Sequence, residues 1–255
     1  MAPSLYDTHV HLDFMRDMEE VAAQARELGL GMFATTVTPQ GYERTKRLLD
    51  GAPNVQVGVG LHPWWVADGR CGEAEVERAA EHAATWRFVG EIGLDLSPAH
   101  VPEGSQDAQV KALERLATSC AETSDATTRK VLSIHSVRAA GLTLDVLEQT
   151  GALATCNCIF HWFSGTSDEL HRAVKAGCWF SINEMMLRTR RGREYARQLP
   201  ADRLLLETDL PPGEDVPFSA TEIVAQLERT IDQLSTIRGC DVRSLTRRNS
   251  ERLLS

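Results

Sequence analysis

The sequence places histidines and carboxylates at the ends of several short apolar segments. In the segment D-T-H-V-H, residues 7–11, His9 and His11 are two positions apart. Residues i and i+2 of a β-strand point to the same side, so both imidazoles could bind one ion. Imidazoles and carboxylates without a thiolate suit Zn²⁺, Mn²⁺ or a similar divalent ion. Taken alone, the H-x-H pair is equally typical of two histidines satisfied inside a core.

The same pattern recurs along the chain, which favours a metal site over a chance pair. Five of the eight histidines follow apolar segments, whereas His82, His100 and His171 fall in predicted helices or loops and are expected at the surface. Six candidate ligands are too many for one tetrahedral zinc ion and suit two ions bridged by a carboxylate. Two such ions activate a water for hydrolysis. The candidate ligands are His9, His11, Glu91, His135, His161 and Asp209.

These residues need a scaffold that brings strand ends together. Apolar, β-branched segments alternate with segments of helical period, which predicts parallel βαβ units. Eight such units in 255 residues match a (β/α)₈ barrel, in which the carboxyl ends of all strands meet on one face. A doubly wound open sheet is the alternative, although no G-x-G-x-x-G follows the first strand. We expect one domain over residues 1–255, with strands at 4–10, 31–37, 55–61, 87–94, 130–136, 152–162, 178–182 and 203–210.

Composition excludes several classes of protein. The chain has 42% hydrophobic and 25% charged residues, which is ordinary for a globular protein and excludes a disordered or fibrous one. A net charge of −9 excludes a passive nucleic-acid-coating protein, but not an enzyme that meets one or two phosphates through metal ions and a local arginine patch. No apolar run reaches 18 residues, the first residues do not resemble a signal peptide, and the six cysteines form no C-x-x-C pair. We therefore expect a cytoplasmic protein with free thiols and no membrane association.

Six motifs in order resemble one known family. They are DTHVHLD (7–13), GLHP (60–63), GEIGLD (90–95), SIHS (133–136), FHWFSG (160–165) and ETDLP (207–211). Across the whole chain they resemble the TatD family of metal-dependent deoxyribonucleases, which are amidohydrolase-like barrels. The resemblance implies a hydrolase that cleaves DNA phosphodiester bonds with water activated by two divalent ions, of zinc, manganese or magnesium.

The resemblance also implies a role for each motif residue. It assigns His9, His11 and Asp209 to one ion, His135 and His161 to the other, and Glu91 to both as the bridge. Asp209 would serve as the general base and His62 would contact the substrate phosphate. Asp95 would orient a ligand imidazole, although a turn or cap residue is an equal reading of its position.

Further residues are candidates for substrate contact. Arg190 and Arg191 belong to an arginine-rich segment, residues 188–193, in a predicted loop on the catalytic face; they would clamp the DNA backbone or simply face solvent. Arg138 stands one position beyond the place where the family has a phosphate-binding arginine, here Val137. Trp162 could stack on a base, or pack beneath the loops.

Two finer hypotheses and two alternatives accompany the nuclease prediction. The arginine-rich segment, with HWFSG and GCWFSIN (177–183), resembles the QatD branch of the family, which implies anti-phage defence and protein partners of a Qat-type complex. A two-metal site also polarises carbonyl groups, so the alternative enzyme hydrolyses a carboxylic ester or amide, such as an aminoacyl-tRNA. A non-enzymatic binding subunit is the third reading, which the intact ligand set disfavours.

Overall fold

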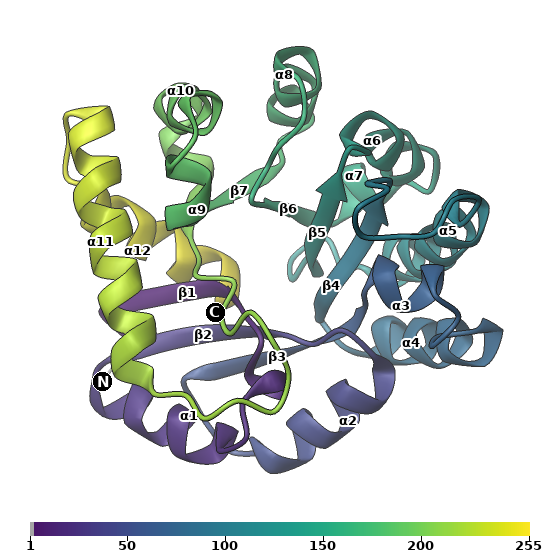
Figure 1. Ribbon diagram of the computed structural model, residues 1–255, viewed down its shortest axis with the longest axis horizontal. Coiled ribbons are helices and arrows are strands. Elements are labelled where there is room, and N and C mark those ends of the chain that lie inside the picture. Colours follow the sequence, from purple (N-terminus) through teal and green to yellow (C-terminus); the bar gives the residue numbers. More distant parts are fainter. Residues whose placement is uncertain (1–2) are drawn as a thin grey trace.

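The structure, a computed structural model that describes residues 3–255, is an eight-stranded parallel barrel surrounded by helices (Figure 1). Each strand pairs in parallel with the next one along the chain, in the order β1 to β8. This order confirms the predicted (β/α)₈ barrel and excludes a doubly wound sheet. The strands are β1 (Leu5–Val10), β2 (Leu30–Thr35), β3 (Val55–Leu61), β4 (Phe88–Asp95), β5 (Val131–Val137), β6 (Asn157–His161), β7 (Trp179–Ile182) and β8 (Leu204–Leu206).

The helices begin and end at residues suited to those positions. Thr38 accepts a hydrogen bond from the backbone N–H of Gly41 and precedes Pro39, so it caps α2. Gly239, with φ of 64°, ends α11 in the left-handed region. The helices are α1 (Met18–Glu27), α2 (Pro39–Leu48), α3 (Pro63–Ala67), α4 (Glu73–Thr85), α5 (Gln106–Thr123), α6 (Ala140–Gln149), α7 (Ala152–Thr155), α8 (Ser167–Lys175), α9 (Glu184–Leu187), α10 (Arg190–Gln198), α11 (Ala220–Arg238) and α12 (Val242–Leu254), with short 3-10 helices η1 (Leu12–Phe14) and η2 (Ala201–Arg203).

The segment that follows β8 lies against β1. The backbone N–H of Asp209 donates to the carbonyl of His9 at 3.0 Å, and the N–H of His11 donates to the carbonyl of Leu210 at 2.8 Å. These bonds bring the last strand next to the first at the carboxyl end of the barrel. Residues about 200 positions apart in the sequence therefore meet at one site.

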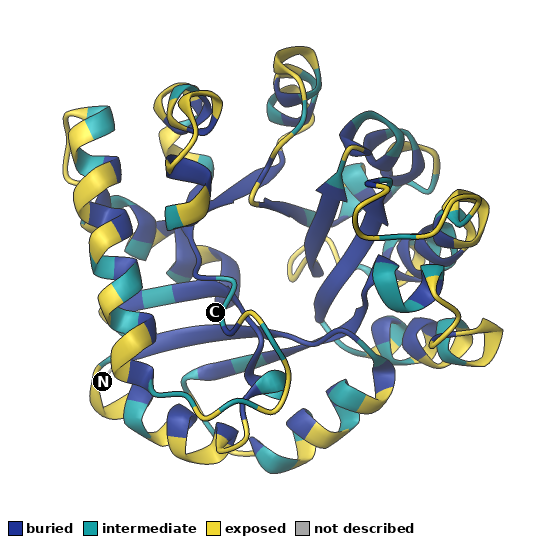
Figure 2. Cartoon of the chain, viewed as in Figure 1, coloured by how far each residue is buried: buried dark blue, intermediate teal, exposed yellow. Residues whose placement is uncertain are grey.

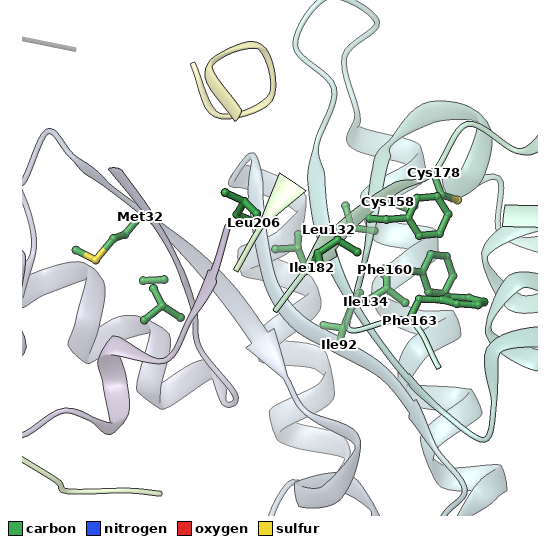
Figure 3. Packing of buried hydrophobic residues seen from close by; sticks show 14 of the residues in the cluster. Met32, Ile92, Leu132, Ile134, Cys158, Phe160, Phe163, Cys178, Ile182 and Leu206 are labelled. Carbon is green, nitrogen blue, oxygen red and sulfur yellow. The ribbon is translucent and has the colours of Figure 1, made fainter. Parts of the chain in front are cut away.

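The strands are buried almost throughout, while the helices expose only their outer faces (Figure 2). Apolar side chains such as Ile92, Leu132 and Phe160 form the main core, seen from close by in Figure 3. A second, smaller group lies near the amino ends of the strands, and we call it the amino-end cluster. It consists of Phe33, Phe88, Val131, Ile159, Trp179, Leu205, Leu253 and Leu254.

Two predicted strands extend several residues beyond the real ones. The prediction of a strand over residues 152–162 is wrong in its first part, because Ala152–Thr155 forms helix α7. A short apolar run does not distinguish helix from strand, and here Gly151, with φ of 80°, starts a new turn. The strand predicted over 203–210 ends at Leu206, and Asp209 beyond it has φ of 60°, which a strand residue does not adopt.

Two observations concern compartment and membrane. The six cysteines are free, and all but Cys240 are buried. Within residues 3–255, no helix combines the length and apolar character needed to cross a membrane.

Candidate active site

The carboxyl ends of the strands surround a pocket of about 690 Å³, which we call the main pocket. Strands β1, β3, β4, β5 and β6, together with the segment after β8, each contribute a histidine or a carboxylate to it or to the cluster beneath it. All six predicted metal ligands lie in this cluster, and His62 joins them. The histidines and Glu91 are buried, and only Asp209 has a partly exposed side chain, at 23%.

One oxygen of Glu91 faces three imidazoles. Its Oε1 lies 2.8 Å from Nδ1 of His135, 2.9 Å from Nε2 of His161 and 3.2 Å from Nε2 of His62. Glu91 is on β4, His135 is on β5 and His161 is on β6, while His62 directly follows β3. In the parallel register Glu91 pairs with Ser133 and His135 pairs with Gly93, so Glu91 reaches the histidines from two residues deeper in the barrel.

The other oxygen of Glu91 faces the H-x-H pair on β1. Oε2 lies 3.3 Å from Nε2 of His11 and 3.5 Å from Nε2 of His9. Oδ1 of Asp209 lies 3.2 Å and 3.6 Å from the same two nitrogens. Glu91 thus stands between two groups of imidazoles, one at each carboxylate oxygen.

The outer nitrogens of the β1 histidines have partners that orient the rings. Nδ1 of His11 donates to the carbonyl of Thr35 at 2.7 Å. Because a carbonyl only accepts, Nδ1 carries a proton, and Nε2, which faces the two carboxylates, is the nitrogen that can bind an ion once it is deprotonated. Nδ1 of His9 lies 2.7 Å from the hydroxyl of Ser133.

Asp95 orients His135 in the same way. Nε2 of His135 donates to Asp95 Oδ2 at 3.1 Å, which leaves Nδ1 to face Glu91. The indole N–H of Trp64 and Nδ1 of His100 donate to the same oxygen at 2.7 and 2.8 Å. Burial acts to raise the pKa of Asp95, but these hydrogen bonds hold it well below its usual range. Its other oxygen accepts from the N–H of Ser97 at 2.8 Å, a hydrogen bond typical of a turn residue.

His62 presents a different atom to the pocket. Its Nδ1 accepts the backbone N–H of Trp64 at 3.1 Å at the start of α3. A neutral His62 therefore carries its proton on Nε2, which faces Glu91. Burial lowers the pKa of His62 to about 4, so the ring is neutral at pH 7. His11 and His135 thus direct inward a nitrogen that can bind an ion once it is deprotonated, whereas neutral His62 directs an N–H donor inward.

His161 approaches a second buried carboxylate behind the site. Its Nδ1 lies 3.8 Å from Glu207 Oε1, and Glu207 is held by the hydroxyl of Ser181 and by Nδ2 of Asn183 at 2.8 Å. Nδ1 of His161 and Nε2 of His9 are buried and make no hydrogen bond within the described chain. Unpaired buried nitrogens directed at carboxylates are typical of ligand atoms.

The electrostatics of the cluster favour bound positive charge. Burial acts to lower the pKa of His11, but hydrogen bonds to Asp209 and Glu91 raise it well above its usual value. Burial acts to raise the pKa of Glu91, but the surrounding imidazoles, His62 and His161 foremost, hold it well below its usual range. A site that attracts protons onto imidazoles also attracts divalent cations.

The donor set fits metal ions on geometry as well as on charge. Three groups of ligand atoms have all members within 4.8 Å of one another: His9 with His11 and Glu91, His9 with His161 and Asp209, and His62 with Glu91 and His135. The first two consist entirely of predicted ligands. The third contains His62, but the hydrogen bond from Trp64 occupies one nitrogen lone pair and leaves a proton on the other. His62 is thereby set apart from the ligands.

Strained backbone marks the same end of the barrel. Arg138, Trp162 and Asp209 have φ of 54°, 39° and 60°, in the left-handed region that non-glycine residues rarely adopt. They follow the ends of β5, β6 and β8. Strain of this kind is concentrated at functional sites, where it costs on the order of 1–3 kcal/mol per residue.

The predicted substrate contacts divide between two places. Trp162 lines the main pocket and is 37% exposed. Arg138 is exposed and is not among the residues that line the pocket. The prediction that Arg190 and Arg191 lie in a loop is wrong: Thr189 caps α10, and the two arginines form its first turn and line a separate groove. From the arginine-rich segment, Arg188 reaches the main pocket.

Sequence reasoning missed two contributors. His100 was expected at the surface, and although it is exposed, it lines the main pocket and donates to Asp95. Glu207 is the first residue of the ETDLP motif, but its place behind His161 was not predicted. Its position two residues before Asp209 was the available signal.

Together, barrel and site define a class: (β/α)₈-barrel hydrolases with a histidine and carboxylate metal site at the carboxyl face. The family described as TatD related DNase matches residues 6–255, and the chain belongs to this family. It is a TatD-family metal-dependent hydrolase.

Individual relatives agree with this assignment. The chain is 28% identical to the 3'-5' ssDNA/RNA exonuclease TatD of Pantoea vagans, over 96% of this chain and 95% of that protein. It is 25% identical to the uncharacterized metal-dependent hydrolase YabD of Bacillus subtilis, over 98% of both. The structure of a TatD-family hydrolase from Entamoeba histolytica superposes with a TM-score of 0.78 at 15% identity, over 99% of this chain and 98% of that one, and so shows the same fold.

Proposed function

We propose that this chain hydrolyses phosphodiester bonds at the end of a DNA strand, using water activated by two divalent ions. The observation that carries the proposal is the opposed arrangement around Glu91: ligand nitrogens face both of its oxygens, while His62 directs a neutral N–H donor into the same space. That donor suits a phosphate oxygen. The name of the Pantoea relative, an exonuclease on single-stranded nucleic acid, supports the same substrate class.

Each residue of the site would have a defined role in metal binding or catalysis. His9, His11 and Asp209 would hold one ion, His135 and His161 the other, and Glu91 both. Bound there, the ions would supply Lewis acidity and lower the pKa of a bound water. Asp209, with the more exposed of the two carboxylates, would accept the proton of the attacking water. Nε2 of His62 would donate to a phosphate oxygen and hold it while charge develops.

The walls of the main pocket suit a nucleotide. Trp64, Trp65 and Trp162 lie at its edge with Phe14, and the rings of Trp64 and Trp65 are nearly parallel, with centroids 6.4 Å apart. Trp162 is exposed and Trp64 and Trp65 are half-buried, and an accessible aromatic face stacks on bases without regard to sequence. A buried site at the bottom of a pocket admits a strand end more readily than the middle of a duplex, so we propose an exonuclease on single-stranded or frayed ends.

A substrate panel tests the proposal. The protein is stripped with a chelator and supplied with Mn²⁺, Mg²⁺ or Zn²⁺, then offered single-stranded DNA, duplex DNA, RNA and an aminoacyl ester. We expect metal-dependent release of nucleotides from single-stranded DNA and none from the Glu91→Gln variant. Faster turnover of the aminoacyl ester than of any phosphodiester would replace the proposal with the deacylase alternative.

The resemblance to the QatD branch extends the proposal to anti-phage defence in the cytoplasm, within a complex of protein partners. Its support is the arginine-rich segment 188–193 and the flanking motifs of the sequence. Phage should form fewer plaques on cells that carry the gene in its native neighbourhood than on cells without it. The Glu91→Gln variant should abolish that protection. Equal plaque numbers with both forms would remove the defence role and leave the nuclease proposal intact.

A further inference from the structure

A groove of about 520 Å³ lies between α8 and α10, outside the main pocket. The two helices are neighbours in the ring around the barrel, following β6 and β7 (Figure 1). We call this feature the α8–α10 groove. Ser167, Leu170 and His171 line it from α8, and Arg190, Arg191 and Tyr195 line it from α10.

The charge of the groove is positive and is not compensated within the chain. Arg190 and Arg191 are exposed and form no ion pair with any residue in 3–255. The one acidic residue of the groove, Glu194, is already paired with Arg197 at 2.5 Å. Two guanidinium groups are therefore free to bind an anion, and planar guanidinium matches phosphate particularly well.

The floor of the groove is apolar and ordered. Leu170, Tyr195 and Leu199 are buried and line the groove together with the arginines. The hydroxyl of Tyr195 donates to the carbonyl of Gly165 at 2.9 Å and lies 3.5 Å from that of Ser167, which fixes the ring. A cationic edge beside an apolar floor suits a ligand with a phosphate and a flat, weakly polar ring, the two parts of a nucleotide.

Two chain segments connect the groove with the main pocket. Arg188 lines the pocket and Arg190 lines the groove, so their Cα atoms are at most about 7 Å apart. Ser164 lines the pocket and Ser167 lines the groove, at most about 11 Å apart. Phosphates of a stacked strand are spaced about 3.4 Å along the axis, so a strand leaving the pocket reaches the groove within a few nucleotides.

We propose that the α8–α10 groove binds the backbone phosphates and one base of a nucleic-acid strand whose end occupies the main pocket. The inference rests on the proposed function, since it takes the polynucleotide as the occupant of both places. It differs from a clamp beside the scissile bond, because Arg190 and Arg191 lie outside the main pocket. The groove would raise affinity for long strands without taking part in the reaction.

Binding without metal isolates this role. A fluorescent single-stranded 12-mer is titrated with protein in a chelator, at several salt concentrations. For the Arg190→Ala/Arg191→Ala variant we expect a Kd about 10-fold higher and a salt slope smaller by about 1.4, since each phosphate contact on a single strand contributes about 0.7 to that slope. The matched control is Arg44→Ala/Arg47→Ala, which removes two exposed, unpaired arginines from α2 and should change Kd less than about twofold.

Catalysis separates the groove from the site. With metal, the variant should show a higher KM for the 12-mer and an unchanged kcat/KM for the p-nitrophenyl ester of thymidine 5'-phosphate, which fills only the main pocket. Equal Kd values for both double variants, or an unchanged salt slope, would overturn the groove proposal. The surface would then be interpreted as a docking site for a protein. If no phosphodiester is cleaved with any ion while 12-mer binding still depends on the arginine pair, the proposed function fails and the groove proposal stands.

Discussion

The two ends of the barrel bury opposite kinds of side chain. At the carboxyl end, imidazoles and carboxylates converge around Glu91, and some of their buried nitrogens have no partner in the described chain. At the amino end, the amino-end cluster packs Phe33, Phe88 and Trp179 against Leu253 and Leu254 of α12. The same eight strands thus carry a reactive end and an apolar end.

Buried side-chain nitrogens at the two ends also differ in their hydrogen bonds. Lys130 directly precedes β5 near the amino end, and it is buried. Its ammonium group donates to the carbonyls of Ala84 and Trp86 at 3.1 and 2.8 Å. Nε2 of buried His9, by contrast, makes no hydrogen bond within residues 3–255. The buried ammonium group near the amino end is thus satisfied by backbone carbonyls, whereas a buried imidazole nitrogen at the carboxyl end is available for a ligand.

Removing the central charge should have the largest effect. Glu91→Gln keeps the shape of the side chain but removes the negative charge that five imidazoles share. We expect kcat to fall at least about 1000-fold, which corresponds to about 4 kcal/mol of barrier. Metal content measured by mass spectrometry should fall with it. Near-normal turnover in this variant would contradict the idea that the carboxyl end is the reactive one.

The reciprocal experiment removes bulk from the amino end. Phe33 is fully buried, and its ring centroid lies 5.8 Å from that of Phe88. Phe33→Ala should lower the free energy of unfolding by about 3–5 kcal/mol, through lost burial and a cavity. Denaturant titration followed by circular dichroism measures this change. Metal content and kcat at low temperature should stay within about twofold of wild type, and a large loss of bound metal would show that the two ends are coupled.

The sequence predicted the reactive end better than its surroundings, for a physical reason. Alternation of strand and helix determines the barrel, and the barrel brings every strand end to one face, so Glu91 and His135 could be placed together without coordinates. Arg190 was misplaced because the position of a loop end depends on capping, here by Thr189, and a one-turn shift moves a side chain to another groove. The tautomer of His62 depends on a hydrogen bond from the backbone of Trp64, which no pattern of residue types reveals.

A milder change tests how the reactive end is supported. Asp95→Asn removes the charge that orients His135 and should lower metal affinity about 10- to 100-fold. Isothermal titration with Zn²⁺ or Mn²⁺ measures this, and excess metal should restore part of the activity. The matched control is Glu43→Gln, because Glu43 also contacts a histidine, His82 at 2.8 Å, but lies between α2 and α4 away from the pocket. Equal losses of affinity in both variants would remove the orienting role from Asp95.

Two tryptophans provide the finest comparison of the two ends. Trp162 is 37% exposed at the main pocket, whereas Trp179 is 3% exposed in the amino-end cluster, with the guanidinium groups of Arg203 and Arg252 at 4.9 and 4.7 Å from its ring. If Trp162 stacks on a base, Trp162→Ala should raise KM for single-stranded DNA about 10-fold, because one stacked base is worth about 1–3 kcal/mol. Its melting temperature should hardly change. Trp179→Ala should lower the melting temperature and leave KM unchanged, since its ring contributes burial and cation–π contacts but faces no substrate. If instead Trp162→Ala lowers the melting temperature and leaves KM alone, Trp162 packs beneath the loops, and substrate recognition at the carboxyl end depends on the polar groups.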